Sequence, residues 1–334
     1  MNLIYNISIS LAIIISLLLT VAYLIYFERK VIGFMQNRLG PNRVGFLGLL
    51  QPFADLIKLL SKEIIIPTKA SKKLFLVAPF IMLIPAITAW AVIPLSDSIV
   101  NANLTYGLLF IFMLSSVSIY GVLISGWASN SKYAILGALR AAAQMISYEI
   151  PLGLSIVAII LATGSLNLYE IVTFQSGGVQ NWLIWPLFPI FIVFWICGVA
   201  ETNRAPFDLA EGESELVAGF HVEYSGLLFT IFFLSEYANM ILISALTTIC
   251  FFGGWHPITF GYDAIDAYLK MIPSIGWFVI KIWFFLFLYL WIRATLPRFR
   301  YDQLMQFGWK FLIPISLIWI VFIAFLIKLD IGIL

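Results

Sequence analysis

The feature that most constrains this chain is its succession of long apolar segments. Of the 334 residues, 62% are hydrophobic and only 11% are charged, whereas soluble domains carry about 45–50% apolar and about 25% charged residues. A bilayer core of about 30 Å is crossed by roughly 20 apolar residues in a helix. The sequence predicts an all-α integral membrane protein that forms a single membrane domain over residues 1–334. Eight transmembrane helices are expected, near 3–27, 75–95, 104–126, 138–162, 182–200, 225–249, 276–296 and 309–328.

Eight spans place both termini on one side, and the basic residues indicate which side that is. With alternating spans, all but three of the 19 Lys and Arg residues lie on the side of loops 28–74 and 201–224; the exceptions are Lys270, Lys281 and Lys328. Such an excess is typical of cytoplasmic or matrix loops. We predict that the charged loops face the matrix or the bacterial cytoplasm and that both termini face away.

The loop 28–74 contains an amphipathic segment. Phe53, Leu56 and Leu60 follow helical spacing, with Asp55 on the opposite, polar face. This pattern predicts a helix lying in the membrane interface. A core helix of a small soluble domain is the alternative, but it needs more chain than this loop supplies.

Two carboxyl groups fall at the centre of predicted spans. Glu149 lies about 11 residues into its span, which is roughly 16 Å of helix, and Glu236 lies at the same depth in another. A charge there costs on the order of 2.5–3.5 kcal/mol, so each group should face the protein interior and can hold a proton. With Tyr148 and Tyr237 beside them, they are candidate proton carriers. Packing as neutral acids between helices is the alternative.

Three cations lie near the ends of predicted spans. Lys281 and Arg140 are close enough to an end for the side chain to reach the surface, so we predict structural roles. Arg293 lies beside Trp291 at the charged-side boundary. It is either an interfacial anchor or a functional group.

The segment 201–217 is the most unusual part of the sequence. It contains a single basic residue, Arg204, among the acidic residues Glu201, Asp208, Glu211, Glu213 and Glu215, with Glu223 beyond it. In a helix some of these acids share one face, so they should titrate as a coupled set. A solvated loop is the alternative, although the interleaved apolar residues favour packing against the membrane domain. No calcium loop pattern occurs, so no metal site is expected.

Several functional classes find no support in the sequence. There is no glycine-rich nucleotide loop, and Cys197 and Cys250 lack the spacing of a metal or iron–sulfur site. We therefore expect no metal, flavin or iron–sulfur cluster in this chain, and no catalytic residue that acts in isolation.

Several segments resemble subunit 1 of respiratory complex I and its bacterial counterpart. The most specific is AETNRAPFDLAEGESEL at 200–216. Also similar to that family are ERK at 28–30, QNRLGPN at 36–42, QPFAD at 51–55, GWASN at 126–130, AQMISYE at 143–149 and PRFRYDQL at 297–304.

This resemblance implies a core membrane subunit of proton-translocating NADH:ubiquinone reductase, with ubiquinone as substrate. It implies as partners the other membrane-arm subunits, the quinone-reducing peripheral-arm subunits and membrane lipids, and no nucleic acid. A quinone chamber is implied at Glu28, Arg29, Phe53, Asp55, Phe220 and Arg293. Proton transfer or coupling is implied at Glu149, Tyr148, Glu201, Arg204, Asp208, Glu211, Glu213, Glu215, Glu223 and Glu236.

Two other functions remain open on the residues alone. A proton-coupled secondary transporter could use the two central carboxyls, although no repeat is visible. A membrane anchor for a related hydrogenase complex would need the basic loops but not those carboxyls. The 29 phenylalanines and many isoleucines favour the mitochondrial inner membrane, with the bacterial plasma membrane as the alternative.

Overall fold

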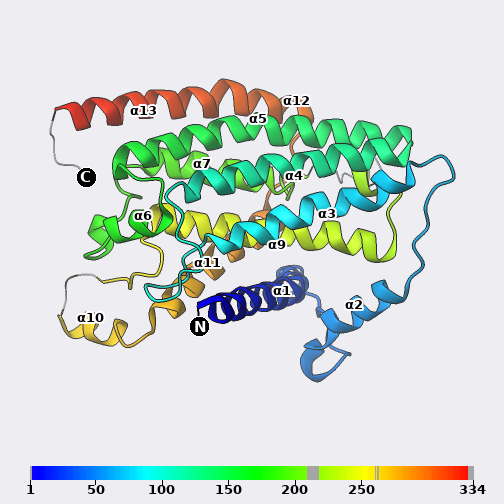
Figure 1. The fold of residues 1–334 in the computed structure, drawn as a ribbon, viewed down its shortest axis with the longest axis horizontal. Coiled ribbons are helices and arrows are strands. Elements are labelled where there is room, and N and C mark those ends of the chain that lie inside the picture. The colour runs from blue at the N-terminus through cyan, green and yellow to red at the C-terminus, as the bar shows by residue number, and fades with distance from the viewer. Residues whose placement is uncertain (1, 209–217, 260, 262, 330–334) are drawn as a thin grey trace.

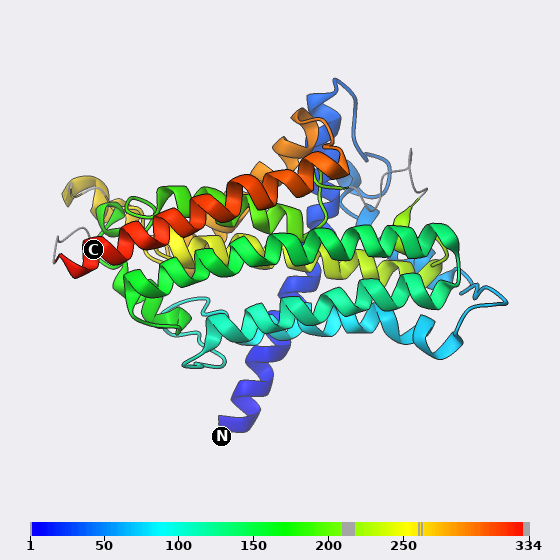
Figure 2. The same ribbon diagram turned by 90° about the horizontal axis from the view of Figure 1, so that it is seen from above.

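The structure is a computed structural model that describes residues 2–208, 218–259, 261 and 263–329, and within these ranges it contains helices and no β-strand. Most of the long helices run side by side in one bundle (Figure 1). Helix α1 (Asn2–Met35) instead crosses the bundle at a steep angle (Figure 2). The predicted all-α class is confirmed for the described part of the chain.

Each predicted span overlaps a helix of the structure, with ends that differ by up to eight residues. The long ones are α1, α3 (Lys72–Thr88), α4 (Gly107–Ser129), α5 (Lys132–Thr163), α7 (Phe188–Glu201), α9 (Gly226–Phe251), α11 (Ser274–Thr295) and α13 (Ile313–Lys328). The shorter ones are α2 (Gln51–Ser61), α6 (Leu168–Phe174), α10 (Asp263–Leu269) and α12 (Tyr301–Phe307). The remaining helical turns are η1 (Phe46–Gly48), η2 (Ala89–Ala91), η3 (Val179–Asn181), η4 (Gly219–His221) and the π-helical η5 (Gly308–Leu312), which joins α12 to α13.

Seven helical segments in the described residues are long and apolar enough to cross a membrane. The eighth predicted span, 182–200, corresponds to the shorter α7, which has 14 residues. At 1.5 Å per residue it is about 21 Å long, less than the roughly 30 Å of a bilayer core. It starts late because Trp182–Leu187 forms turns, with Pro186 and Pro189 on either side of the helix start.

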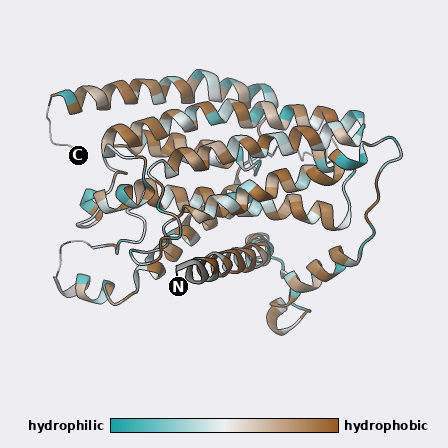
Figure 3. Ribbon diagram, viewed as in Figure 1, coloured by the Kyte–Doolittle hydropathy of each residue, from teal (hydrophilic) through white to brown (hydrophobic). Residues whose placement is uncertain are grey.

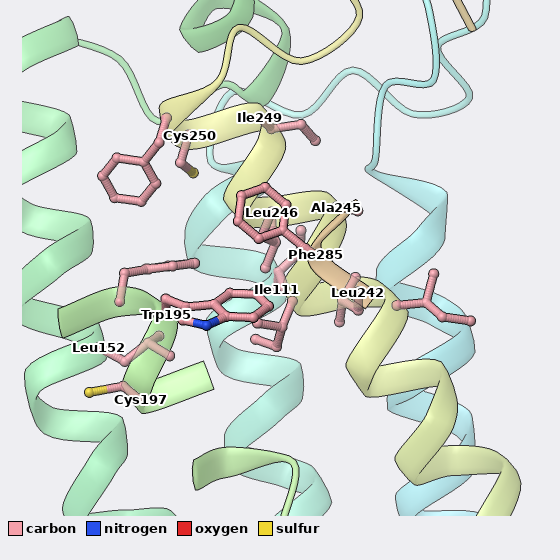
Figure 4. Packing of buried hydrophobic residues seen from close by; sticks show 14 of the residues in the cluster. Ile111, Leu152, Trp195, Cys197, Leu242, Ala245, Leu246, Ile249, Cys250 and Phe285 are labelled. Atoms are coloured by element: carbon pink, nitrogen blue, oxygen red, sulfur yellow. The ribbon is translucent and has the colours of Figure 1, made fainter. Parts of the chain in front are cut away.

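The core of the bundle forms where α7 and α9 meet their neighbours. In Figure 4, Leu242 and Leu246 of α9 lie near Ile111 of α4 and Trp195 of α7. Cys197 and Cys250 are buried in this core as free thiols. The long helices are hydrophobic around most of their surface (Figure 3), which is the pattern of helices buried on one side by protein and covered on the other by lipid.

The predicted amphipathic helix is α2, and it lies beside α1 and apart from most of the bundle (Figure 1). Phe53 packs edge to face on Tyr23 of α1, with ring centroids 6.2 Å apart. Ile57 and Leu60 are exposed on its outer side. Helix α2 is therefore fixed to α1 by one face while apolar residues remain free to meet lipid or a partner.

Candidate functional site

Glu28 of α1 is buried between three helices. It is 6% exposed, accepts a hydrogen bond of 2.6 Å from the hydroxyl of Tyr237 in α9 and forms an ion pair with Arg293 of α11. A buried carboxylate needs such partners, because moving the charged group out of water costs much free energy unless it is paired and hydrogen-bonded. Arg293, whose role the sequence left open, therefore pairs with Glu28 and does more than anchor the helix at the membrane surface.

Arg204 and Glu236 form a second buried pair next to the first. The nitrogen to oxygen distance is 3.3 Å, and the two side chains are only 7% and 5% exposed. The guanidinium of Arg204 also lies over the ring of Tyr237, 4.1 Å from its centroid. Tyr237 thus contacts both ion pairs, one through its hydroxyl and the other through its ring. We call Glu28, Arg204, Glu236, Tyr237 and Arg293 the Arg204 cluster.

Four members of the Arg204 cluster line a groove of about 640 Å³: Glu28, Arg204, Tyr237 and Arg293. The apolar residues Ile25, Ile32 and Phe233 contribute to the same lining, and Arg29 and Arg38 contribute positive charge. At the rim, Arg29 forms an ion pair with Asp55 of α2 at 2.7 Å. The groove therefore has both apolar and charged residues in its lining, four arginines among them, so it can contact an apolar chain and also donate hydrogen bonds to acceptor oxygens.

A third group of polar residues lies between α4, α5 and the end of α7. Glu149 of α5 accepts a hydrogen bond from Ser116 of α4. Glu201, at the end of α7, accepts one from Ser115 and lies close enough to Glu149 for the two carboxylates to repel each other. The predicted central carboxyl of α5 therefore has a second carboxyl as its neighbour, brought there by α7.

A small cavity lies between this group of polar residues and α9. It has a volume of about 40 Å³ and is lined by Ser115, Ser118, Glu201 and Asn239, among mostly apolar residues. A cavity of this size with several polar groups has room for water. Because Asn239 lies three residues after Glu236 on α9, one helical turn separates the cavity from the Arg204 cluster.

A family model described as NADH dehydrogenase matches residues 8–324, nearly the whole chain. The chain belongs to this family, which is that of subunit 1 of respiratory complex I. It is accordingly part of an oxidoreductase complex and works together with other subunits. The matched range includes every residue of the Arg204 cluster, and it also includes Glu149 and Glu201.

The six residues that the resemblance assigned to a quinone chamber occupy two places in this family member. Glu28, Arg29 and Arg293 line the groove, and Asp55 contacts it through Arg29. Phe53 of α2 packs on Tyr23 of α1 and is not among the residues that line the groove. The sixth residue, Phe220, is fully buried in η4 and packs edge to face on Phe232, in a separate cluster formed by α3, α4, α5 and the start of α9.

The proton-transfer candidates outside these groups have varied surroundings. Tyr148 points away from the neighbouring carboxyl, because its hydroxyl donates to the Leu304 carbonyl at 2.9 Å. Asp208 is paired with Arg298 at 3.1 Å. Glu223 is partly buried between η4 and α9. Three of the predicted acids lie outside the described residues: Glu211, Glu213 and Glu215.

Sequence reasoning missed several polar residues that organise the site. The amide of Gln144 donates to the carbonyls of Ala200 and Phe207, both at 2.8 Å, and so fixes the chain that leaves α7. Ser115, Ser116 and Asn239 were also overlooked. Their positions in apolar helices were the available signal, since a polar side chain within a membrane span usually faces protein.

The expectation that Lys281 reaches the surface was wrong, whereas its predicted structural role stays a prediction. Its side chain does not extend to the surface but is buried, with an exposed fraction of 6%. Its ammonium donates to the carbonyls of Phe252, Gly254 and His256 at 2.7, 2.9 and 2.7 Å. The chain after α9 folds back over the lysine, so three main-chain acceptors replace the water that a surface position would have offered.

Proposed function

We propose that this chain forms the chamber through which ubiquinone enters complex I, and that it couples quinone reduction to proton translocation through a series of carboxylates. One observation carries the proposal. Tyr237 contacts both Glu28, which lines the groove, and Arg204, which holds Glu236 inside the bundle. A change of charge in the groove therefore has a direct physical route to an intramembrane carboxylate.

The composition of the groove supports quinone as the ligand. An isoprenoid quinone has a long apolar tail and a headgroup whose oxygens accept hydrogen bonds. Ile25, Ile32 and Phe233 suit the tail, while Arg29 and Arg38 can donate to the headgroup. Helix α2 has exposed apolar residues and is joined to the rim by the Arg29–Asp55 ion pair. The quinone tail would pass from the lipid into the groove beside this helix, so Phe53 and Asp55 belong to the proposed opening.

The coupling follows from electrostatics. Quinone reduction consumes protons, and a proton that reaches Glu28 weakens its bonds to Tyr237 and Arg293. Because the Tyr237 ring contacts the Arg204 guanidinium, the balance of charge at Glu236 then changes, and the reverse influence must exist to the same extent. Water in the cavity beside Asn239 can continue the path to Glu201 and Glu149.

The remaining assignments extend this proposal to the rest of the complex. Asp208, Glu211, Glu213, Glu215 and Glu223 serve as further carriers or coupling groups on the charged side. The electron-transfer centres belong to partner subunits of the peripheral arm, because this sequence has neither nucleotide nor iron–sulfur motifs. The mitochondrial inner membrane is the proposed location, with the basic loops facing the matrix and both termini on the opposite side.

Two variants test the two parts of the proposal separately in the assembled complex. Glu149→Gln keeps the shape and hydrogen bonding of the side chain but removes its charge, so it should lower the number of protons moved per electron. Ala294→Trp fills the groove and should raise the KM for long-chain quinones at least several-fold more than for short, water-soluble ones, with less change in kcat.

Each variant also serves as the control for the other, and Ala294→Ser is the matched small substitution. Glu149→Gln should leave the ratio of the two KM values unchanged, and Ala294→Trp should leave the proton to electron ratio unchanged. An unaltered proton to electron ratio in Glu149→Gln would mean that this carboxyl has only a packing role. Equal slowing with both quinone classes would mean that the groove is not the quinone path.

A further inference from the structure

An open apolar groove of about 300 Å³ lies on the side of the bundle formed by α4, α5 and the start of α3. Its walls include Leu74, Leu123, Trp127, Ile135 and Leu139. At its base α4 and α5 touch, because Gly126 has no side chain: a Cβ there would stand 2.4 Å from the Cβ of Ala138. The groove is therefore a built concavity between helices.

Four lysines lie close in the chain to residues that line this groove. Lys69, Lys72, Lys73 and Lys132 are all exposed, and none of them takes part in an ion pair within the described ranges. The sequence contains no acidic residue between Ile64 and Ser96 or between Ser98 and Tyr148. The described residues therefore show four exposed lysines here and no ion pair that neutralises them.

The main chain holds these lysines next to the groove. Ser71 donates its backbone N–H to the Ala128 carbonyl at 3.0 Å, and the Asn130 side chain donates to the Lys69 carbonyl at 3.2 Å. The start of α3 is therefore attached to the end of α4, one turn beyond Trp127. On α5, Lys132 lies three residues before Ile135 and so on the same face of the helix as the groove wall.

We propose that this groove binds an anionic phospholipid, with an acyl chain along the apolar walls and the phosphate at the four lysines. The positive charge of the lysines complements the negative phosphate of such a lipid. Trp127 and Tyr133 are exposed near the lysine end, and exposed aromatic residues of this kind mark the level of lipid headgroups. Basic pockets between membrane helices on the positively charged side suit phosphate headgroups. Neutral lipid would gain the apolar contacts but not the electrostatic ones.

Photo-crosslinking in the purified, delipidated complex tests this site. The probes are phosphatidylglycerol and phosphatidylcholine with the same diazirine-bearing acyl chain, and peptide mass spectrometry locates the adducts. Phosphatidylglycerol should label residues 123–139 at least several-fold more than phosphatidylcholine. In Lys72→Gln/Lys73→Gln/Lys132→Gln, its labelling at subsaturating lipid should fall at least ten-fold, since each lysine near the surface contributes roughly a factor of five.

Two further variants separate the groove from general effects. Lys310→Gln/Lys328→Gln changes exposed lysines elsewhere and should leave the labelling unchanged. Leu139→Trp fills the groove without changing charge and should reduce labelling even if the triple lysine variant fails to assemble. Equal labelling by the two lipids, labelling that survives Leu139→Trp, or adducts between residues 123–139 and a neighbouring subunit in place of lipid would each overturn the proposal.

Discussion

The Arg204 cluster and the site of Lys281 both bury charge within the helical bundle, but they stabilise it differently. In the Arg204 cluster, carboxylates and guanidinium groups from α1, α9, α11 and the segment after α7 compensate one another beside a groove. Lys281 is instead compensated by three backbone carbonyls of a single short segment. Side-chain charges can change with protonation, whereas carbonyl dipoles cannot.

This difference separates a group suited to respond from a group suited to hold a structure. Glu28 contacts both Tyr237 and Arg293, so a proton bound by this carboxylate would alter both interactions of the Arg204 cluster. The carbonyls around Lys281 carry no titratable charge, so a change of charge at this site could come only from the lysine itself. A charge buried in a membrane protein is often taken as a sign of function, and we expect the nature of its partners to distinguish the two roles.

The largest effect is expected from Arg204→Met. Removing the guanidinium leaves Glu236 buried without this cation, and loss of one partner of a buried pair costs about 3–5 kcal/mol. Thermal unfolding of the purified complex should shift strongly downward, and quinone reductase activity should fall. In the double variant Arg204→Met/Glu236→Gln the stability should recover in large part, without recovery of proton translocation. If the double variant is as unstable as the single one, the pair does not hold this region together.

A smaller effect is expected from Lys281→Met. The methionine fills much of the same space but leaves carbonyls of the 252–256 segment without their donor, which costs about 1–3 kcal/mol. Hydrogen exchange in this segment should accelerate, while turnover and the proton to electron ratio stay unchanged. Lys328→Met, at the exposed end of α13, is the matched control. A change in proton stoichiometry in Lys281→Met would place this lysine among the coupling groups.

The contrast between the two regions also marks what the sequence could predict. Hydropathy located the long helices, because the length and apolarity of a span are local properties of the chain. It also located Glu149 and Glu236, since a carboxyl in an apolar run is visible without a structure. The family resemblance brought Glu28, Arg204 and Arg293 into the predicted site.

The partners of these groups could not be predicted, because they are distant in the chain. Glu28 meets residues 209 and 265 positions away, and no periodicity reports such a contact. The same reason explains why Lys281 was wrongly expected to reach the surface: it lies seven residues after the start of α11 at Ser274, and the return of the chain over it depends on tertiary packing. The resemblance likewise assigned Phe220 to the quinone chamber. In the structure Phe220 belongs to η4 and packs in a separate hydrophobic cluster, away from the residues that line the groove.

The smallest effect is expected from His256→Gln, which tests how rigid the Lys281 site is. Burial, and then the charge of Lys281, lower the pKa of His256, although a hydrogen bond with the Val172 backbone and the charge of Asp97 oppose this shift. The folded protein therefore favours neutral histidine, whereas the unfolded chain protonates it near pH 6.5. Its contribution to stability is complete above about pH 6.5 and is lost as the pH falls towards the lower pKa of the folded state.

Unfolding midpoints of the wild-type complex should thus decline more steeply below pH 6.5 than those of His256→Gln, while the two should run parallel at higher pH. Identical slopes below pH 6.5 would mean that the segment opens easily enough for His256 to protonate without cost, and the Lys281 site would then be less rigid than its three carbonyl contacts indicate.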